Sequence, residues 1–143
     1  MNSSRWLGLA ALALALLSLF LPAIEGPGFP SQRGMDILRR GASAWRDGVV
    51  AWYANPLLFG ALIAVALARY RIGLGIGLVA SVLALSSFTA AGVAASAGRA
   101  VPPFGFAIGF HVWLLAFVVA DAAAALGIYK EWKSRRRSGS LIR

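Results

Sequence analysis

Charged side chains are spaced so far apart along this chain that they leave four long apolar stretches. These stretches cover residues 6–24, 48–68, 72–97 and 106–129. Only the last stretch is interrupted, by His111 and Asp121. An α-helix rises about 1.5 Å per residue, so about 20 residues cross a hydrocarbon core of about 30 Å. The pattern therefore predicts four transmembrane helices over these ranges.

The order of apolar residues also decides between the two structures that can span a bilayer. Inside lipid the backbone must satisfy its own hydrogen bonds, which restricts spanning segments to helices and closed β-barrels. Barrel strands alternate polar and apolar positions over about 10 residues, and residues 7–21 show no such alternation. The sequence thus predicts an all-α integral membrane protein, a single domain with four transmembrane helices in an antiparallel bundle.

The first stretch has a second interpretation, because Arg5 followed by an apolar run resembles a secretory signal peptide. A cleavage site needs small residues, whereas Leu21 stands two before Ala23, where a small residue would be required, and Pro22 lies between them. We therefore expect a retained helix.

Residues 25–47 form the loop between the first two predicted spans. Residues 25–30 are rich in glycine and proline, which excludes a helix there. Beyond Gly34, apolar residues recur at helical spacing and share one face: Leu38, Ala42, Trp45, Val49 and Trp52. The pattern predicts a short amphipathic helix on the outer surface of the membrane, leading into the second span.

Three arginines fall largely on the opposite side of this predicted helix: Arg39, Arg40 and Arg46. Two interpretations of the helix remain open. In the first, these arginines and Trp45 contact lipid headgroups. In the second, they form a docking surface for a partner protein.

The composition agrees with a membrane protein. Of 143 residues, 59% are hydrophobic, 13% are charged and none is cysteine. Soluble domains average about 45–50% apolar and about 25% charged residues. An ordinary cytosolic enzyme, a disordered tail and a disulfide-stapled secreted domain are thereby excluded. The bias toward alanine, leucine and arginine suggests a bacterial source.

The distribution of basic residues predicts the orientation. Four spans place both termini on one side of the membrane. That side then holds nine of the 14 basic residues: Arg5, Arg69, Arg71, Lys130, Lys133, Arg135, Arg136, Arg137 and Arg143. By the positive-inside rule, both termini are expected in the cytoplasm, at a bacterial inner membrane.

Residues 130–143 form a basic tail that follows the last span. Arg135, Arg136 and Arg137 make it suited to bind anionic lipid headgroups. Nucleic-acid binding is not expected, because no aromatic or folded reading surface accompanies the charge.

Asp121 is the strongest candidate for a functional residue within the membrane. By helix rise it lies about 13 Å from the inner interface, where an acidic side chain faces protein or a water-filled cavity. Ser81 of an antiparallel third span would lie at equal depth. Three roles are open: a hydrogen bond to Ser81 or Ser86 that holds two helices together, a proton or cation relay, and pairing with a basic residue of a partner subunit.

His111 and Asn55 are expected at similar depths near the outer interface, and Pro56 should bend the second span there. The simplest expectation is a hydrogen bond between His111 and Asn55. The alternative is that His111 ligates a haem or a chlorophyll-type pigment, which the absence of a second histidine disfavours. We therefore predict no cofactor, no metal site and no catalytic residue.

Small residues mark the predicted helix-packing faces. Gly73, Gly77 and Ser81 recur every four residues in the third span, and Ala120 and Ala124 lie in the fourth. Such faces let helix backbones approach closely. They favour packing within one chain, with a homodimer seam at the two glycines as the alternative.

No motif in the sequence carries a named chemistry, so we do not expect an enzyme. We expect a non-catalytic accessory or scaffold subunit of a larger bacterial inner-membrane complex, in contact with lipids and with partner membrane proteins or further copies of itself. The alternatives are a homo-oligomeric small channel or transporter that uses Asp121, and a membrane immunity or stress protein.

Overall fold

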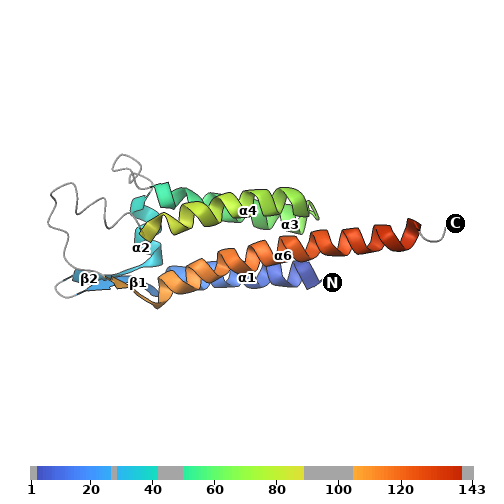
Figure 1. The fold of residues 1–143 in the computed structure, drawn as a ribbon. Coiled ribbons are helices and arrows are strands. Elements are labelled where there is room, and N and C mark those ends of the chain that lie inside the picture. Colours follow the sequence, from blue (N-terminus) through green and yellow to red (C-terminus); the bar gives the residue numbers. More distant parts are fainter. Residues whose placement is uncertain (1–2, 27–28, 42–49, 89–104, 140–143) are drawn as a thin grey trace.

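The computed structural model describes residues 3–26, 29–41, 50–88 and 105–139, which are mostly helical and include one small sheet. The helices are α1 (Ser3–Phe20), α2 (Gly34–Gly41), α3 (Ala54–Ala66), α4 (Tyr70–Leu85) and α6 (Ile108–Gly139). A short 3-10 helix, Val50–Tyr53, leads into α3. Figure 1 shows α1, α3, α4 and α6 side by side, with α6 running beyond the other three.

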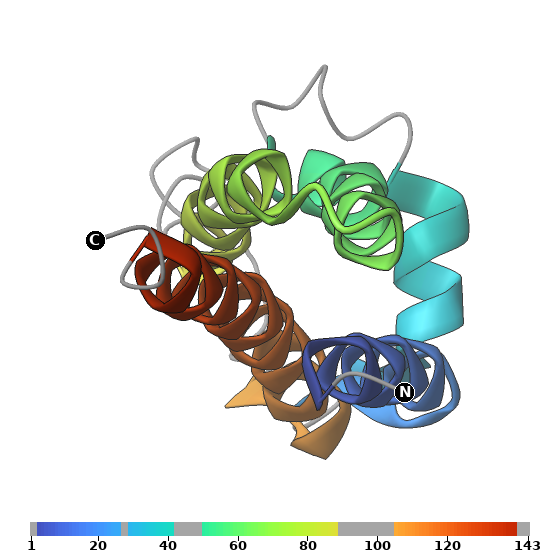
Figure 2. The same cartoon turned by 90° about the vertical axis from the view of Figure 1, so that its right-hand side faces the viewer.

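The four long helices are arranged as two pairs. α1 packs along α6 and α3 packs along α4, and the pairs meet chiefly where α4 contacts α6. Seen end-on in Figure 2, the order around the bundle is α1, α6, α4 and α3. The link between α3 and α4 is short because Ala68 adopts a left-handed conformation, with φ of 58°. That conformation lets the amide of Arg69 donate to the carbonyl of Ala64 at 2.8 Å.

The structure confirms that the chain is mostly helical and that it contains long apolar helices. Two helices, Ser3–Phe20 and Ile108–Arg137, are long and apolar enough to cross a membrane. The helices in the second and third apolar stretches are shorter, at Val50–Ala66 and Tyr70–Leu85. Residues 89–97 of the predicted third span lie outside the described part of the chain.

The first and last helices differ in extent from the predicted spans. The first helix ends at Phe20 rather than at residue 24, because Pro22 has no amide hydrogen to continue the helix and instead begins a strand. The last helix begins at Ile108, and it continues to Gly139 instead of ending before the basic tail.

The purely helical prediction is corrected by a three-stranded sheet in the order β2-β1-β3. β1 (Pro22–Gly26) and β2 (Phe29–Arg33) pair antiparallel, and they include the described residues of the glycine- and proline-rich segment in which no helix was expected. β3 (Gly105–Phe106) adds to the other edge of β1, with Phe106 opposite Ile24. The sheet thus joins the ends of α1 and α6.

The sheet and α2, together called the platform, are held tightly against the bundle. The amide of Gly34 donates to Leu21 at 3.2 Å, and the amide of Ala107 donates to Ala23 at 2.9 Å. Glycine is required at two close approaches: a Cβ on Gly34 would lie 2.5 Å from the Ser18 carbonyl oxygen, and one on Gly109 would lie 2.7 Å from that of Pro22.

The predicted amphipathic helix is present over Gly34–Gly41, as α2. Trp52, from the other end of the predicted apolar face, donates its indole N–H to the carbonyl of Leu38 at 2.9 Å. Arg39 is exposed. The remaining predicted positions, Ala42, Trp45, Arg46 and Val49, and the side chain of Arg40 lie outside the described part of the chain.

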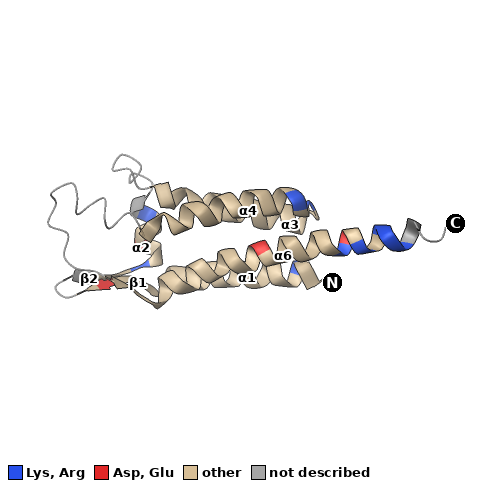
Figure 3. Ribbon diagram, in the orientation of Figure 1, with Lys and Arg blue, Asp and Glu red and all other residues tan. Residues whose placement is uncertain are grey.

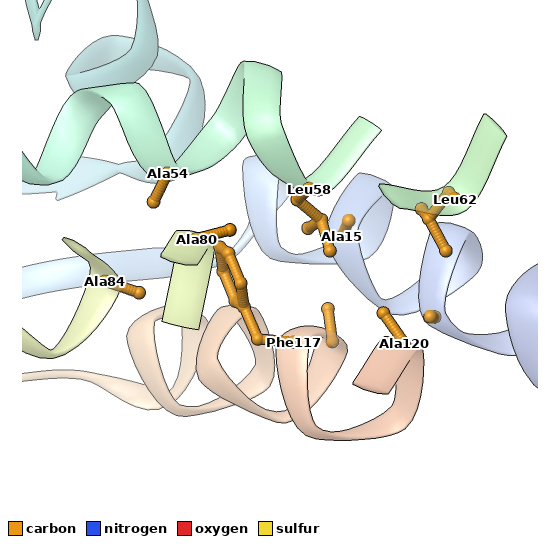
Figure 4. Packing of buried hydrophobic residues seen from close by; sticks show 10 residues of the cluster. Ala15, Ala54, Leu58, Leu62, Ala80, Ala84, Phe117 and Ala120 are labelled. Atoms are coloured by element: carbon orange, nitrogen blue, oxygen red, sulfur yellow. The ribbon is translucent and has the colours of Figure 1, made fainter. Parts of the chain in front are cut away.

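The bundle buries small side chains and exposes large ones. Alanines from all four helices are buried, with a few larger residues such as Leu58 and Phe117 between them (Figure 4). On the outer surface, Val82 is 68% exposed and Val118 is 64% exposed, whereas Ala80 and Ala116 are fully buried. In a protein stabilised by hydrophobic burial from water, the large apolar residues would face the core.

Charged side chains gather at the two ends of the bundle (Figure 3). One end carries the start of α1, the turn between α3 and α4, and the basic part of α6. The other end carries Arg33 and Arg39 of the platform. Between them, Asp121 is the one charged residue that the described helices place in the middle of the bundle.

Candidate functional site

Asp121 lies at the contact between α4 and α6 and is half-buried there. The hydroxyl of Ser81 on α4 donates to its Oδ2 at 2.8 Å. The predicted pairing of Asp121 with Ser81 is therefore present. Ser86, the other partner considered, donates its hydroxyl to the carbonyl of Leu83, one turn back in its own helix.

Gly77 makes this approach sterically possible. The Oδ1 atom of Asp121 occupies the space into which a Cβ on Gly77 would project. Oδ1 is buried and has no hydrogen-bond partner among the residues that the structure describes. One carboxylate oxygen is thus held by Ser81, while the other is packed against the bare backbone of α4.

The remaining small residues bring the helices together on either side of this contact. Gly73 is buried against α3, where a Cβ would lie 3.1 Å from Val65. Ala120 and Ala124 of α6 are also buried. Gly73 and Gly77 therefore pack within the chain, as the first of the two packing interpretations expected, and are not on a free outer face.

The expected hydrogen bond between His111 and Asn55 is wrong. Asn55 accepts instead from the indole N–H of Trp113 at 2.9 Å, and its side-chain amide donates to the carbonyl of Trp52 at 3.2 Å. The side chain of His111 is exposed, and its Nδ1 lies 3.0 Å from the carbonyl oxygen of Ala107. The prediction compared only the depths of His111 and Asn55. The two residues also need to face each other, and on α6 it is Trp113, not His111, that faces α3.

An aromatic cluster near the platform was missed in the sequence. Phe106 stacks on Phe110 with ring centroids 4.0 Å apart, and Phe88 meets both rings edge-on. Trp113 continues the cluster toward the core, because its ring meets that of Phe117 at 4.9 Å. The spacing of 110, 113 and 117 along one face of the predicted helix was the available signal, and Phe106 joins these residues from β3.

The opposite end of the bundle is basic and aromatic. Lys130 of α6 donates to the hydroxyl of Ser3, which fixes α6 beside the start of α1. Arg135, Arg136 and Arg137 are exposed on the extension of α6. The guanidinium of Arg136 lies 3.8 Å from the centroid of the Trp132 ring, a cation–π contact.

No group of three His, Cys, Asp or Glu residues capable of holding a metal ion occurs within residues 3–26, 29–41, 50–88 and 105–139. Comparison with protein families, with curated proteins and with solved structures gives no match. The candidate site is therefore defined by its geometry: Asp121, Ser81 and Gly77 at the contact of α4 with α6.

We predict that Gly77→Ala destabilises the protein because its methyl group displaces the Asp121 carboxylate. Overpacking of this kind costs about 1–3 kcal/mol. Unfolding of the detergent-solubilised protein by heat or by SDS measures the effect. Gly75→Ala is the matched control, since a Cβ there meets nothing within 4 Å.

A double-mutant cycle with Asp121→Ala tests the proposed cause. Removing the carboxylate makes room for the methyl group, so Gly77→Ala should cost little in the Asp121→Ala background. Equal costs of Gly77→Ala in both backgrounds would show that Asp121 is not the group displaced.

Proposed function

We propose that this chain is a four-span bacterial inner-membrane protein that serves as a non-catalytic accessory or scaffold subunit of a larger membrane assembly. The membrane placement is supported by the outward position of large apolar side chains and the inward position of small ones. Lipid tails solvate large apolar residues as well as a protein core does, so membrane helices associate through close packing of small residues and through polar contacts.

The four-span topology is supported by the charged ends of the bundle and by its middle, where Asp121 is the one charged residue of the described helices (Figure 3). The 18 residues of α1 are about 27 Å long and the 16 residues of α4 about 24 Å. A hydrocarbon core is about 30 Å thick, and short spans are accommodated by local thinning and by flanking residues that reach the interface.

The cytoplasmic placement of both termini is supported by the basic end of the bundle. The start of α1, the turn between α3 and α4, and the extension of α6 all lie at this end. The aromatic residues Tyr129 and Trp132 on α6 lie there too, with ring centroids 6.2 Å apart. Lys and Arg are enriched on the cytoplasmic side of membrane proteins, and Trp and Tyr are enriched at both interfaces, so the basic residues support the orientation and the aromatic ones support an interface at this depth.

The role as a scaffold is supported above all by the engagement of Asp121 inside the chain. This carboxylate accepts a hydrogen bond from Ser81 and contacts Gly77, so it connects the two helix pairs. The platform adds a fixed surface outside the span, on which Arg33 and Arg39 are exposed. These features suit a subunit that presents a rigid face to a neighbour.

One observation favours a second candidate, a homo-oligomeric channel or small transporter that uses Asp121. The Oδ1 atom of Asp121 is buried without a hydrogen-bond partner in the described part of the chain. Buried polar atoms are normally paired, and an unpaired carboxylate oxygen within a span is a feature of ion and proton pathways.

Single cysteines test the topology, because the natural sequence contains none. With a membrane-impermeant maleimide, Ser31→Cys on β2 should react in intact cells, and Lys133→Cys on α6 should react only after the inner membrane is opened. Val82→Cys is the critical variant. Val82 is 68% exposed in the chain alone, and lipid should nevertheless shield it until SDS denaturation. Labelling of Val82→Cys as fast as that of Ser31→Cys would contradict a membrane span at α4.

Purification in mild detergent tests the scaffold role. The protein should retain a partner membrane protein in a fixed ratio, measured by quantitative mass spectrometry. Arg33→Glu combined with Arg39→Glu should reduce the retained partner by at least about tenfold, because charge reversal at a contact both removes attraction and adds repulsion. Arg5→Glu combined with Lys133→Glu, at the other end of the bundle, is the charge-matched control, because both residues are exposed there. A monodisperse homo-oligomer without a partner would overturn the scaffold role.

Flux through reconstituted liposomes tests the second candidate. Asp121→Asn keeps an oxygen that can accept from Ser81 but removes the charge, so it should abolish proton or cation flux by a channel that depends on Asp121. Ser81→Ala is the control that breaks the hydrogen bond and leaves the carboxylate. Flux at the wild-type rate in Asp121→Asn would end this candidate.

A further inference from the structure

A groove of about 610 Å³ opens between α4 and α6 at the basic end of the bundle. Its lining residues are Arg71, Leu74, Ala125, Ile128, Tyr129, Glu131, Trp132 and Arg135. Its volume falls within the range of about 300–1,000 Å³ that is usual for small-molecule sites. None of the sequence-derived hypotheses described this groove, because its two sides come from segments far apart in the chain.

Two arginines face the groove from different helices, Arg71 from α4 and Arg135 from α6. Neither forms an ion pair within the part of the chain that the structure describes. The single acidic residue of the lining is Glu131. The lining therefore keeps a net positive charge, and both guanidinium groups can still bind an anion.

The start of α4 adds to the attraction for an anion at the same place. Arg71 is the second residue of this helix, and the residue before the helix, Arg69, provides no side-chain cap for its first amides. The first amides of a helix point outward at its positive end, so they favour a negatively charged group nearby. Arginine adds paired donors that match the oxygens of a phosphate group.

The rest of the lining is apolar or aromatic. Leu74, Ala125 and Ile128 line the groove on the side toward the bundle, where α4 and α6 converge. They converge closely because Gly127 leaves room for the ring of Tyr70 at the start of α4. Tyr129 and Trp132 lie beside the arginines, as aromatic residues do at the level of lipid headgroups.

We infer that this groove binds one anionic glycerophospholipid. Arg71 and Arg135 hold its phosphate, and Leu74, Ala125 and Ile128 contact the first part of an acyl chain. The inference rests on the membrane placement proposed above and adds a defined site to it. A free phosphate or a small soluble anion would leave the apolar part of the groove in contact with water, which is why a lipid is the better match.

Native mass spectrometry of the detergent-purified protein tests this site. The probes are dioleoylphosphatidylglycerol and dioleoylphosphatidylcholine, which carry the same acyl chains but differ in net charge. We expect one molecule of the phosphatidylglycerol to remain bound at concentrations where phosphatidylcholine does not. Arg71→Gln combined with Arg135→Gln should weaken this binding about 30-fold, at the usual contribution of a basic residue near a lipid surface.

Two further variants separate the site from general attraction to the membrane. Arg5→Gln combined with Lys133→Gln removes the same charge from the basic end outside the groove and should leave binding unchanged. Ala125→Phe fills the apolar part of the groove and should weaken binding while both arginines remain. Equal binding of both lipids, or an unchanged affinity in the Arg71 and Arg135 variant, would overturn the proposal.

Competition with glycerol 3-phosphate identifies which part of the lipid is recognised. If the apolar lining contributes, millimolar glycerol 3-phosphate should not displace the bound phospholipid; full displacement would show a site for a soluble anion and would overturn the assignment to lipid. The outcome is independent of partner retention and of cysteine labelling, so failure of the lipid site is distinguishable from failure of the proposed scaffold role.

Discussion

The contact between α4 and α6 at Asp121 is the interaction on which the arrangement of the bundle depends. α1 with α6 and α3 with α4 form two extensive pairs, and the contact of α4 with α6 is the main connection between them. At its centre, Ser81 donates to Asp121 while Gly77 gives the carboxylate room. In a medium where hydrophobic burial does not bring helices together, a polar attachment with close backbone approach is an effective way to fix two pairs in register. An apolar residue of similar size, such as leucine, could pack at position 121 but could not accept a hydrogen bond from Ser81.

The distribution of side-chain sizes follows from the same constraint. Helices that meet through alanine and glycine gain dispersion contacts over their whole length, because their backbones lie close together. The larger side chains, such as Ile63 and Val82, are then left on the outside. This arrangement would expose a large apolar surface to water, but it suits a hydrocarbon environment. The small core also makes the packing sensitive to single methyl groups, since an added methyl at Gly77 meets a neighbour and one at Gly75 does not.

The sequence predicts where a residue lies along the length of a helix. It does not predict which direction a side chain faces around the helix axis, nor which segments far apart in the chain come together. The gap pattern located the helices, and equal depth placed Ser81 among the candidate partners of Asp121, of which the structure shows Ser81 and not Ser86. The same depth argument failed for His111, because the rotation of α6 directs Trp113 to Asn55 instead. The sheet was missed because its third strand has two residues and comes from a distant part of the chain. The groove between α4 and α6 was missed for a similar reason, since no local pattern connects Arg71 with Arg135.

The two ends of the bundle differ in which helices are connected there, and only the basic end depends on the contact between α4 and α6. At the platform end, the sheet and the close approach of Gly109 to Pro22 join the end of α1 to the start of α6 without α4. At the basic end, the groove takes one wall from α4 and the other from α6. The distance between its two arginines is therefore set by the same pair of helices that Asp121 and Ser81 hold together. A phospholipid whose phosphate bridges Arg71 and Arg135 would strengthen this helix pair from its open end, so the intramembrane hydrogen bond and the lipid site would stabilise the same interface.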